Sequence, residues 1–250
     1  IQAENFRKML LTLNDDVRVI LIKIADRLHN MQTMDAMPSH KQVKIASETL
    51  YIYAPLAHRL GLYNIKTELE DLGLKYTEPE VYKDILIKIK DSKEEQQKYI
   101  DTFTGILNDA LDKEGFKYEI KGRFKSIFSI RRKMRKQNVS FDEVYDKFAI
   151  RIIYEPTSDD EKFDAWKIYS IVTDFFKPNP ARLRDWISQP KSTGYEALHI
   201  TVIGPQARWV EVQVRSERMD EIAEKGYAAH FKYKQGEVQE NGLEGWLNKL

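Results

Sequence analysis

The hydrophobic period of this chain changes at Gly115, and this change limits its possible folds more than any other feature. Before Gly115, apolar residues recur three or four positions apart, as Ile20, Ile24 and Leu28 do, which is typical of amphipathic helices. After Gly115, apolar residues alternate with polar ones or form short apolar runs, as in β-strands. We therefore predict an α+β chain, in which a helical part precedes a mixed β-sheet flanked by helices.

Helices and strands follow from this pattern, with glycines marking several helix ends. In the first part, helices are expected at Asp16–Met31, Lys41–Leu60, Asn64–Leu72 and Pro79–Lys113. Gly61, Gly73 and Gly115 are the expected helix stops, because glycine readily takes the left-handed conformation found there. In the second part, strands are expected at Phe116–Ile120, Phe148–Tyr154, Leu198–Ile203 and Trp209–Arg215. The remaining helices are expected at Ser126–Lys136, Asp164–Phe175 and Ser216–Tyr233.

Strict alternation in the Trp209–Arg215 segment predicts a two-faced strand. Every even position is valine, whereas the odd positions after Trp209 carry Glu211, Gln213 and Arg215. Successive side chains of a strand point to opposite faces, so one face belongs to the core and the other is polar. An amphipathic sheet with a solvated face is the simpler interpretation, and it explains the alternation equally well.

A hairpin through Gly204 and Pro205 is expected to add further polar side chains to this surface. Odd positions of the two strands should face each other, because a slip of one residue would bury Glu211 and a guanidinium. Tyr195 and His199 in the preceding segment share that parity. An acid, a histidine and a tyrosine on one surface favour a functional site once the two features described next are added.

A basic run, Gly122–Lys133, predicts a phosphate-binding helix. On a helix that begins near Lys125, residues Lys125, Ser129 and Lys133 fall on one stripe because they are spaced by four. The opposite side is apolar and can pack on a sheet. Arg123, just before the helix, adds a guanidinium that can stack on a base or bind a phosphate with two hydrogen bonds. For such a run in isolation, a solvated basic helix is the alternative.

Asp146 is a single acid at the entrance to the apolar Phe148–Tyr154 segment. Together with Glu211 it offers two carboxylates to a divalent cation, while the basic helix supplies cations for the charge of a polyphosphate. A further loop, from Arg182 to Tyr195, places cations beside aromatic residues, a mixture that holds a phosphorylated base by charge and stacking. The combination predicts a magnesium-nucleotide site for phosphoryl transfer.

The composition of the chain indicates where the positive charge of such a site comes from and which cellular environment it fits. The formal net charge of the 250 residues is only +1, so a phosphate site must come from local clustering of cations. The sequence has no cysteine, which excludes disulfides and thiol chemistry and fits a cytoplasmic environment. No apolar stretch approaches the length of a membrane span, so no membrane partner is expected. Because the chain starts at Ile1 inside a helical pattern, we expect it to be a piece of a longer protein.

These motifs resemble the RelA/SpoT family of alarmone synthetase/hydrolases, and the resemblance covers nearly the whole chain. The segments that carry it are Gly122-Arg123-Phe124-Lys125, Tyr145-Asp146 before Ala149-Ile150-Arg151, Gly194-Tyr195-Glu196-Ala197-Leu198-His199 and Val210-Glu211-Val212-Gln213-Val214-Arg215. The resemblance implies a helical remnant of an HD-type hydrolase domain followed by a nucleotidyltransferase-like mixed-sheet domain. It also implies a GTP pyrophosphokinase of the stringent response, which moves the β,γ-pyrophosphate of ATP to the 3′-hydroxyl of GDP or GTP and makes (p)ppGpp.

The resemblance also implies a role for each matching residue. Mg²⁺ is held by Asp146 and Glu211, which form the expected catalytic group with Lys125 and Lys133. The residues expected to bind ATP are Arg123, Lys125, Ser129, Lys133 and Arg151. Those expected to bind GDP or GTP are Arg182, Arg184, Lys191, Tyr195, His199 and Gln213, with the tyrosine stacked on the guanine. Contact with a ribosome or tRNA is implied only through regions outside this sequence.

The chain departs from the family pattern at three positions. Arg184 stands where lysine is common in an Arg-x-Lys-Asp loop, Thr193 where asparagine is common and Phe124 where proline is common. The loop keeps its charge, so the resemblance implies the basic class of loop associated with members that favour GDP. A guanidinium differs from an ammonium in shape and donor geometry, which can shift the preference between GDP and GTP.

The first helix resembles the end of the family's manganese-dependent hydrolase domain. Asp26 matches its last Mn²⁺-binding aspartate, and Asn30 lies one turn later on the same face. The other ligands of that site, histidines and a His-Asp pair, have no match in this sequence, so we expect no alarmone hydrolysis. The expected domains are a hydrolase remnant at 1–75, a synthetase domain at 76–234 and a linker at 235–250.

Two other classes of function remain open. A nucleic-acid-binding protein would use the basic helix as a phosphate patch, made of Arg131, Arg132, Lys133, Arg135 and Lys136. A regulatory module would bind nucleotides without turnover. The enzyme is favoured over an RNA-binding protein, because Asp146 and Glu211 would repel the phosphates of a nucleic acid.

Overall fold

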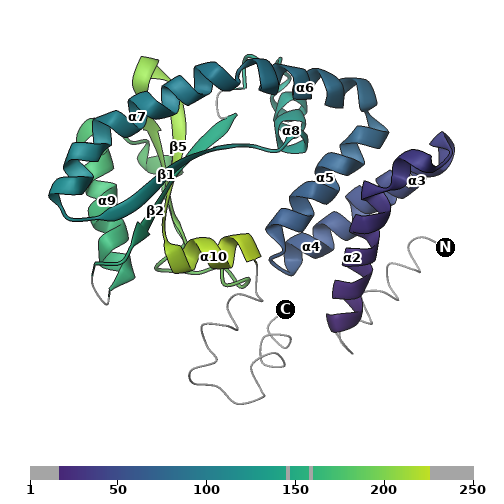
Figure 1. The fold of residues 1–250 in the computed structure, drawn as a ribbon, viewed down its shortest axis with the longest axis horizontal. Coiled ribbons are helices and arrows are strands. Elements are labelled where there is room, and N and C mark those ends of the chain that lie inside the picture. The colour runs from purple at the N-terminus through teal and green to yellow at the C-terminus, as the bar shows by residue number, and fades with distance from the viewer. Residues whose placement is uncertain (1–16, 145–146, 158–159, 226–250) are drawn as a thin grey trace. The chain divides into compact units, whose positions relative to one another are not determined.

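The computed structural model describes residues 17–144, 147–157 and 160–225, which belong to two compact units. Of the described residues, those up to Tyr82 together with Glu224 and Lys225 belong to the helical unit, and those within Lys83–Ala223 belong to the sheet unit (Figure 1). No helix within the described ranges is long and apolar enough to cross a lipid bilayer. The helical part and the mixed sheet confirm the predicted α+β class.

Among the described residues, the helical unit is built on the α-helices α2 to α5, with short irregular turns between them. The elements are α2 (Val17–Gln32), η1 (Met34–Ala36), α3 (Ser39–Glu48), η2 (Thr49–Tyr53), α4 (Ala54–Arg59) and α5 (Tyr63–Thr77). Their apolar faces close over one core, as the helical spacing predicts. Ile20, Ile24, Met31 and Leu69 are almost completely buried in it.

The expected Lys41–Leu60 helix is interrupted in the structure. A single wider π-turn, η2, separates α3 from α4. Pro55 follows directly, in the first turn of α4. Proline has no N–H to donate to the carbonyl four residues earlier, so the regular α-helical ladder cannot run through this position.

Two of the three predicted glycine stops are confirmed. Gly61 and Gly115 have φ angles of 72° and 77°, in the left-handed region that favours glycine. The prediction for Gly73 is wrong, because this residue lies inside α5. A Cβ at Gly73 would lie 2.6 Å from Cγ of Leu50, so the glycine allows the two helical segments to approach closely.

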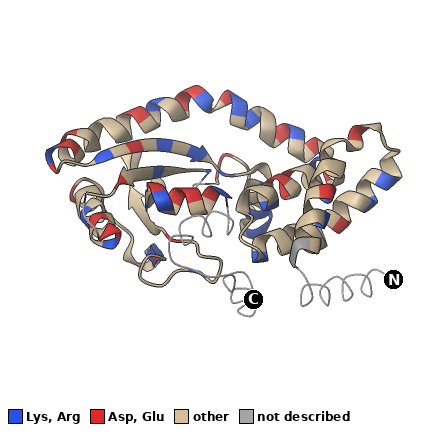
Figure 2. Ribbon diagram, turned by 60° about the horizontal axis from the view of Figure 1, so that its bottom comes forward, with Lys and Arg blue, Asp and Glu red and all other residues tan. Residues whose placement is uncertain are grey.

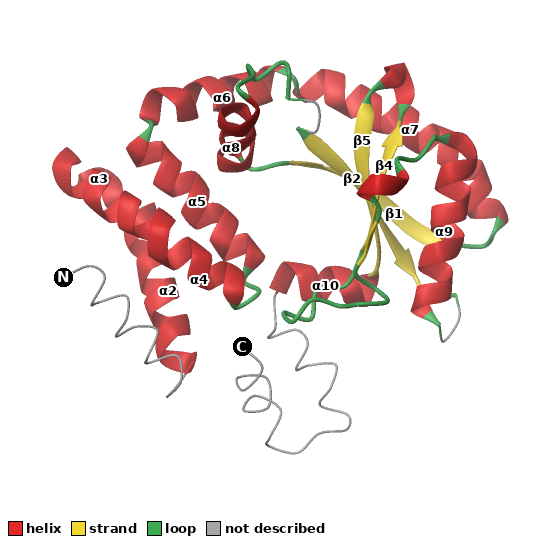
Figure 3. Cartoon of the chain, turned by 180° about the vertical axis from the view of Figure 1, so that it is seen from behind, coloured by secondary structure: helices red, strands yellow, loops and turns green. Residues whose placement is uncertain are grey.

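In the described part of the sheet unit, five strands pair in the order β1-β2-β5-β4-β3. Figure 3 shows β1, β2, β4 and β5 as yellow arrows. Strands β2 and β5 are parallel and the other neighbours are antiparallel, which makes the sheet mixed, as predicted. The strands are β1 (Lys117–Phe124), β2 (Phe148–Glu155), β3 (Arg184–Asp185), β4 (Leu198–Ile203) and β5 (Trp209–Ser216). The helices and helical turns of this part are α6 (Pro79–Asp91), α7 (Lys93–Lys113), α8 (Ile127–Gln137), α9 (Glu161–Phe175), η3 (Pro180–Arg182), η4 (Pro205–Ala207) and α10 (Glu217–Lys225).

Helices α7 and α9 cover one face of the sheet, as Figure 1 shows. Phe103 of α7 and Ile168 of α9 belong to the same buried cluster as Ile150 of β2 and Val212 of β5. Lysines, arginines and acidic residues are interspersed along the rest of α7 (Figure 2). The even-numbered valines of β5 therefore point to the core, and the odd positions are left for the opposite face.

The predicted hairpin register is confirmed. His199 pairs with Gln213 and Thr201 pairs with Glu211, so odd positions face odd positions across β4 and β5. The turn between the strands includes η4, where Gln206 and Ala207 both have positive φ angles.

The prediction that Lys125, Ser129 and Lys133 lie on one helix is wrong for Lys125, which precedes the helix. Strand β1 extends to Phe124, and the amide of Lys125 still bonds to the carbonyl of Lys147 at 2.9 Å. Helix α8 begins only after Ser126, whose hydroxyl caps it by accepting from the amide of Ser129. Lys125 therefore joins the strand to the helix and projects from the end of the sheet.

Candidate active site

The polar face of the sheet gathers side chains from three neighbouring strands. Arg151 of β2 is level with Gln213 of β5, which is level with His199 of β4. Glu211 of β5 is level with Thr201 of β4. Since these positions share one parity, all five side chains lie on the face opposite α7 and α9.

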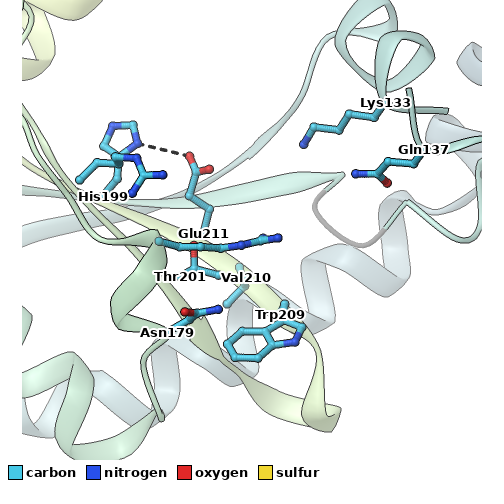
Figure 4. A pocket seen from close by; sticks show the side chains of 10 residues that line it. Lys133, Gln137, Asn179, His199, Thr201, Trp209, Val210 and Glu211 are labelled. Carbon is cyan, nitrogen blue, oxygen red and sulfur yellow. Dashed lines mark ion pairs between the residues drawn. The ribbon is translucent and has the colours of Figure 1, made fainter. Parts of the chain in front are cut away.

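A cavity of about 400 Å³ opens over this face. Figure 4 shows Lys133 and Gln137 of α8 on one side of it and Glu211 and His199 on the other. Arg182 and Arg184 also line the cavity. Five of the residues predicted from the sequence thus line one cavity, in which the lysine and the two arginines supply positive charge.

Glu211 is the acid of this cavity, and its side chain is 25 % exposed. Its Oε1 accepts a hydrogen bond from Nε2 of Gln213 at 2.6 Å. Its Oε2 lies 3.5 Å from Nζ of Lys125, and Oε1 lies 3.6 Å from Nδ1 of His199. The carboxylate is therefore held in one orientation by neighbours from three elements while it still faces the cavity.

His199 is neutral at neutral pH, because burial lowers the pKa of its imidazole to about 4 against the opposing charge of Glu211. Its Nε2 lies 2.7 Å from the hydroxyl of Tyr195. That hydroxyl also accepts a hydrogen bond from Nη2 of Arg215 at 3.0 Å. The other ring nitrogen of His199, Nδ1, faces Glu211.

Lys191 covers the ring of Tyr195 in this structure. Its ammonium lies 4.8 Å from the ring centres of both Tyr195 and Trp186, and burial lowers the pKa of Lys191. Tyr195 is only 8 % exposed. A base that stacks on Tyr195 from this side would therefore have to replace the lysine. Lys191 and Tyr195, two of the residues predicted to bind the guanosine nucleotide, thus lie next to each other.

Of the five residues predicted for ATP, only Lys133 lines the cavity. Lys125 reaches it only through its ion pair with Glu211. Arg123 lines a different cavity of about 420 Å³ together with Lys93 and Glu94 of α7. The hydroxyl of Ser129 accepts a hydrogen bond from the hydroxyl of Ser126 at the start of α8. Arg151 is buried and forms an ion pair with Asp220 of α10, with 3.1 Å between Nη1 and Oδ1.

The metal site can be assessed at Glu211 only, because Asp146 lies outside the described residues. In the part of the chain that the structure describes, no group of three or more His, Cys, Asp or Glu side chains is arranged to hold a metal ion. Mg²⁺ at nucleotide sites commonly takes one or two carboxylates and completes its shell with phosphates and water. The partly exposed oxygens of Glu211, facing a cavity lined by cations, fit that requirement.

Two family models match separate parts of the sequence. Residues 122–238 match the model described as a region found in RelA / SpoT proteins, and residues 1–63 match an HD domain. The sequence thus carries a region found in RelA/SpoT proteins, preceded by a match to an HD domain. The first match contains every residue proposed above for nucleotide binding, and the second contains Asp26 and Asn30.

Named relatives match along the whole chain. It is 44 % identical over 252 residues to a GTP pyrophosphokinase of Myxococcus xanthus, which covers 100 % of this chain and 33 % of that protein. It is 41 % identical over 253 residues to the bifunctional (p)ppGpp synthase/hydrolase SpoT of Escherichia coli K12, covering 100 % of this chain and 35 % of the relative. The chain thus spans about a third of the length of these relatives.

Solved structures of alarmone synthetases are also similar to this chain. One is the crystal structure of small alarmone synthetase 1 from Bacillus subtilis bound to its product pppGpp. The similarity covers 67 % of this chain and 89 % of that one, with 20 % sequence identity and a TM-score of 0.44.

Several cavity residues of this chain were not predicted as site residues. They are Gln137, Asn179, Thr201, Trp209 and Val210. Thr201 and Trp209 share the odd parity of Glu211, and Gln137 lies one turn after Lys133, so periodicity could have found them. Asn179 has no such signal, since it lies in the turn before η3, where its side chain accepts a hydrogen bond from the amide of Ala181.

The predicted hydrolase remnant lies in the helical unit. Nδ2 of Asn30 donates to Oδ2 of Asp26 at 3.1 Å, so the two side chains share one face of α2 as their spacing predicts. Both are exposed. No metal-binding cluster surrounds them within the described ranges.

Proposed function

We propose that this chain carries an ATP:GTP/GDP 3′-pyrophosphotransferase activity and makes the alarmone (p)ppGpp. The observation that carries the proposal is the cavity in which Glu211 faces Lys133, Arg182 and Arg184. A polyphosphate needs cations spread along its length and a carboxylate for its magnesium ion, and this cavity offers both. The resemblance to the RelA/SpoT family gives the same expectation for the substrates.

The donor nucleotide is assigned to the α8 side of the cavity. Lys125 and Lys133 would offset the charge that develops on the transferred pyrophosphoryl group. Arg123 would pack on the adenine, with Ser129 and Arg151 near the nucleotide. For the last three residues the support comes from the family resemblance, because their side chains do not line the main cavity.

The acceptor nucleotide is assigned to the β3–β4 side. Tyr195 would stack on the guanine once Lys191 moves from its ring to the acceptor phosphates. Arg182 and Arg184 would bind the same phosphates, and His199 and Gln213 would hold Tyr195 and Glu211 in place. The guanosine 3′-hydroxyl would then face the donor phosphates across the cavity.

Glu211 and Asp146 would hold the magnesium ion. Bound there, the ion would neutralise phosphate charge and align the donor. In the step itself, the guanosine 3′-oxygen forms a bond to the β-phosphorus of ATP, the bond from that phosphorus to AMP breaks, and the hydroxyl proton leaves to water. The protein contributes mainly by positioning the two nucleotides and by fixed positive charge.

The helical unit is proposed to have no alarmone hydrolase activity of its own. Asp26 and Asn30 supply at most two donors, and among the described residues no group of three or more His, Cys, Asp or Glu side chains is arranged to hold a metal ion. Three or more protein ligands are typical of a catalytic metal site of this kind. The proposed boundaries remain a hydrolase remnant at 1–75, a synthetase domain at 76–234 and a linker at 235–250.

The test is product formation from labelled ATP. The chain is incubated with Mg²⁺, ATP labelled in its β-phosphate and either GDP or GTP, and products are identified by mass spectrometry. Wild type should release AMP and yield guanosine carrying a labelled 3′-pyrophosphate. Asp146→Ala should form no product, while Asp142→Ala, an exposed acid four residues earlier, should behave as wild type.

Each contrary result has a distinct meaning. Binding of both nucleotides without release of AMP would contradict the enzyme and favour a regulatory module. Salt-dependent RNA binding that is insensitive to Asp146→Ala, in a chain that makes no alarmone, would favour the basic face of α8 as a nucleic-acid site.

A further inference from the structure

Asp220 of α10 lies between two buried arginines of the polar sheet face. Its Oδ1 is 3.1 Å from Nη1 of Arg215 and 3.1 Å from Nη1 of Arg151. The side chains of Arg215 and Arg151 are 3 % and 8 % exposed, and that of Asp220 is 18 % exposed. One carboxylate therefore orients two guanidinium groups that water barely reaches.

Arg215 connects Asp220 to the nucleotide cavity. Its Nη2 donates to the hydroxyl of Tyr195 at 3.0 Å and to Oε1 of Gln213 at 2.5 Å. Gln213 in turn donates to Glu211 at 2.6 Å. The guanidinium of Arg215 is thus connected to Tyr195 directly and to Glu211 through Gln213.

The guanidinium has few other fixed contacts. Its Nε is buried and has no hydrogen-bond partner among the described residues. The ring of Tyr195 lies 5.3 Å from its central carbon. The bond from Nη1 to Asp220 and the two bonds from Nη2 together set the rotation of the guanidinium plane, and Asp220 is the one carboxylate among these three partners.

We infer that Asp220 is a positioning residue for the guanosine nucleotide. By orienting Arg215, it holds the hydroxyl of Tyr195 and thereby the plane of the ring on which the base would stack. The inference rests on the proposed function, since it assigns Tyr195 to the guanine. It adds a residue on α10, outside the cavity lining, to the set that determines acceptor binding.

The first measurement is a pair of Michaelis constants for Asp220→Asn. This variant keeps the shape of the side chain but weakens one charge-assisted hydrogen bond. The KM for GDP should rise about ten-fold, the size expected for such a bond. The KM for ATP should change by less than about two-fold, the scatter typical of independent sites.

The second measurement is a double-mutant cycle with Tyr195→Phe. Removing the hydroxyl cuts the path between Arg215 and the ring. In the Tyr195→Phe background, Asp220→Asn should therefore raise the KM for GDP by less than about two-fold. A full ten-fold rise in that background would show that Asp220 does not act through Tyr195, and the inference would be overturned.

Two further variants separate positioning from simple charge neutralisation. Glu217→Gln removes the same charge from an exposed site in the first turn of α10, and both KM values should stay unchanged. Asp220→Glu keeps the charge near both arginines but moves the carboxylate by one methylene, so it should raise the KM for GDP selectively. If Asp220→Asn fails to fold, Asp220→Glu decides alone, and unchanged kinetics for it would refute the positioning role.

The failures of the two proposals are distinguishable. A wild-type chain that makes no 3′-pyrophosphorylated guanosine refutes the proposed function and this inference with it. An active wild type combined with equal rises of both KM values in Asp220→Asn leaves the enzyme intact. In that case the role of Asp220 is to neutralise Arg151 and Arg215, and the inference alone is rejected.

Discussion

Replacing Glu211 by glutamine probes the site with almost no change of shape. The amide oxygen can still accept the hydrogen bond that Gln213 donates at 2.6 Å. The variant loses the negative charge that faces Lys125 at 3.5 Å and the cavity beyond it. Folding and catalysis should therefore respond very differently.

Glu211→Gln should change the free energy of unfolding only slightly. Two unit charges 3.5 Å apart interact by about 5 kcal/mol at an effective dielectric constant of about 20. The cost of removing both groups from water offsets most of this attraction, so the net loss is on the order of 1 kcal/mol. In a chain of this size that lowers the melting temperature by about 2–4 °C.

The effect on turnover should be much larger. Loss of one preorganised charge or donor at the reacting phosphates costs about 10²–10³ in rate, and loss of a metal-binding carboxylate is expected at the upper end. A thousand-fold decrease corresponds to about 4 kcal/mol of transition-state stabilisation. The KM for either nucleotide should change far less than kcat.

The assay is the initial rate of AMP release with GDP and Mg²⁺, with thermal unfolding measured on the same samples. Glu119→Gln is the matched control, because Glu119 pairs with Lys121 at 2.7 Å on an exposed part of β1. It makes the same chemical change to an exposed ion pair with a lysine, and its rate should stay at the wild-type value. A Glu211→Gln variant that keeps more than about a tenth of wild-type kcat would refute the assignment of Glu211 to the reacting phosphates.

Three further predictions concern the surroundings of the site. Gly204→Ala would place Cβ 2.2 Å from the buried hydroxyl of Tyr99, so it should lower the free energy of unfolding by about 1–3 kcal/mol. Adding Tyr99→Phe should restore most of this loss, as measured by urea unfolding. A double variant as unstable as Gly204→Ala would contradict the clash. Replacing Arg182 and Arg184 together by glutamine should raise the KM for GDP about ten-fold and flatten its dependence on salt, whereas an unchanged salt dependence would remove them from the phosphate site. Burial would raise the pKa of Asp185, but a hydrogen bond from the side chain of Ser188 and bonds from the amides of Ser188 and Ile187 outweigh burial and lower that pKa. The stability that the carboxylate contributes is therefore present above pH 3.8 and is lost as the pH falls below that value. Asp185→Asn should accordingly be less stable than wild type at pH 7 and equally stable near pH 2, as measured by urea unfolding at both pH values.

The arrangement of the polar sheet face was predictable because it depends on local rules. Alternation along β5 requires Glu211 and Gln213 to share one face, and burial of the valines then sets the pairing with β4. The left-handed conformations of Gly61 and Gly115 are equally local, since the end of a helix favours a residue without a Cβ. For these features neighbouring residues contain all the necessary information.

Other features depend on which segments meet after folding. Gly73 has the same local signature as a helix stop, yet it lies inside α5. A glycine is needed at this position because the side chain of Leu50 leaves no room for a Cβ. The ion pair between Arg151 and Asp220 likewise has no signal in the sequence. A buried charge takes the partner that packing brings within reach, and no pattern along the chain specifies that partner.

The sequence by itself determined the α+β class, the mixed sheet with its polar face, and the presence of cations, an acid and a tyrosine suited to nucleotides. Only the tertiary structure decided that Lys133, Arg182, Arg184, His199 and Glu211 line one cavity, that Lys191 covers Tyr195, and that Asp220 holds Arg215. Periodicity is a property of neighbours in the chain and can be read from it. The direction of a long side chain and the choice of its partner follow from the packing of helices and strands that are distant in sequence.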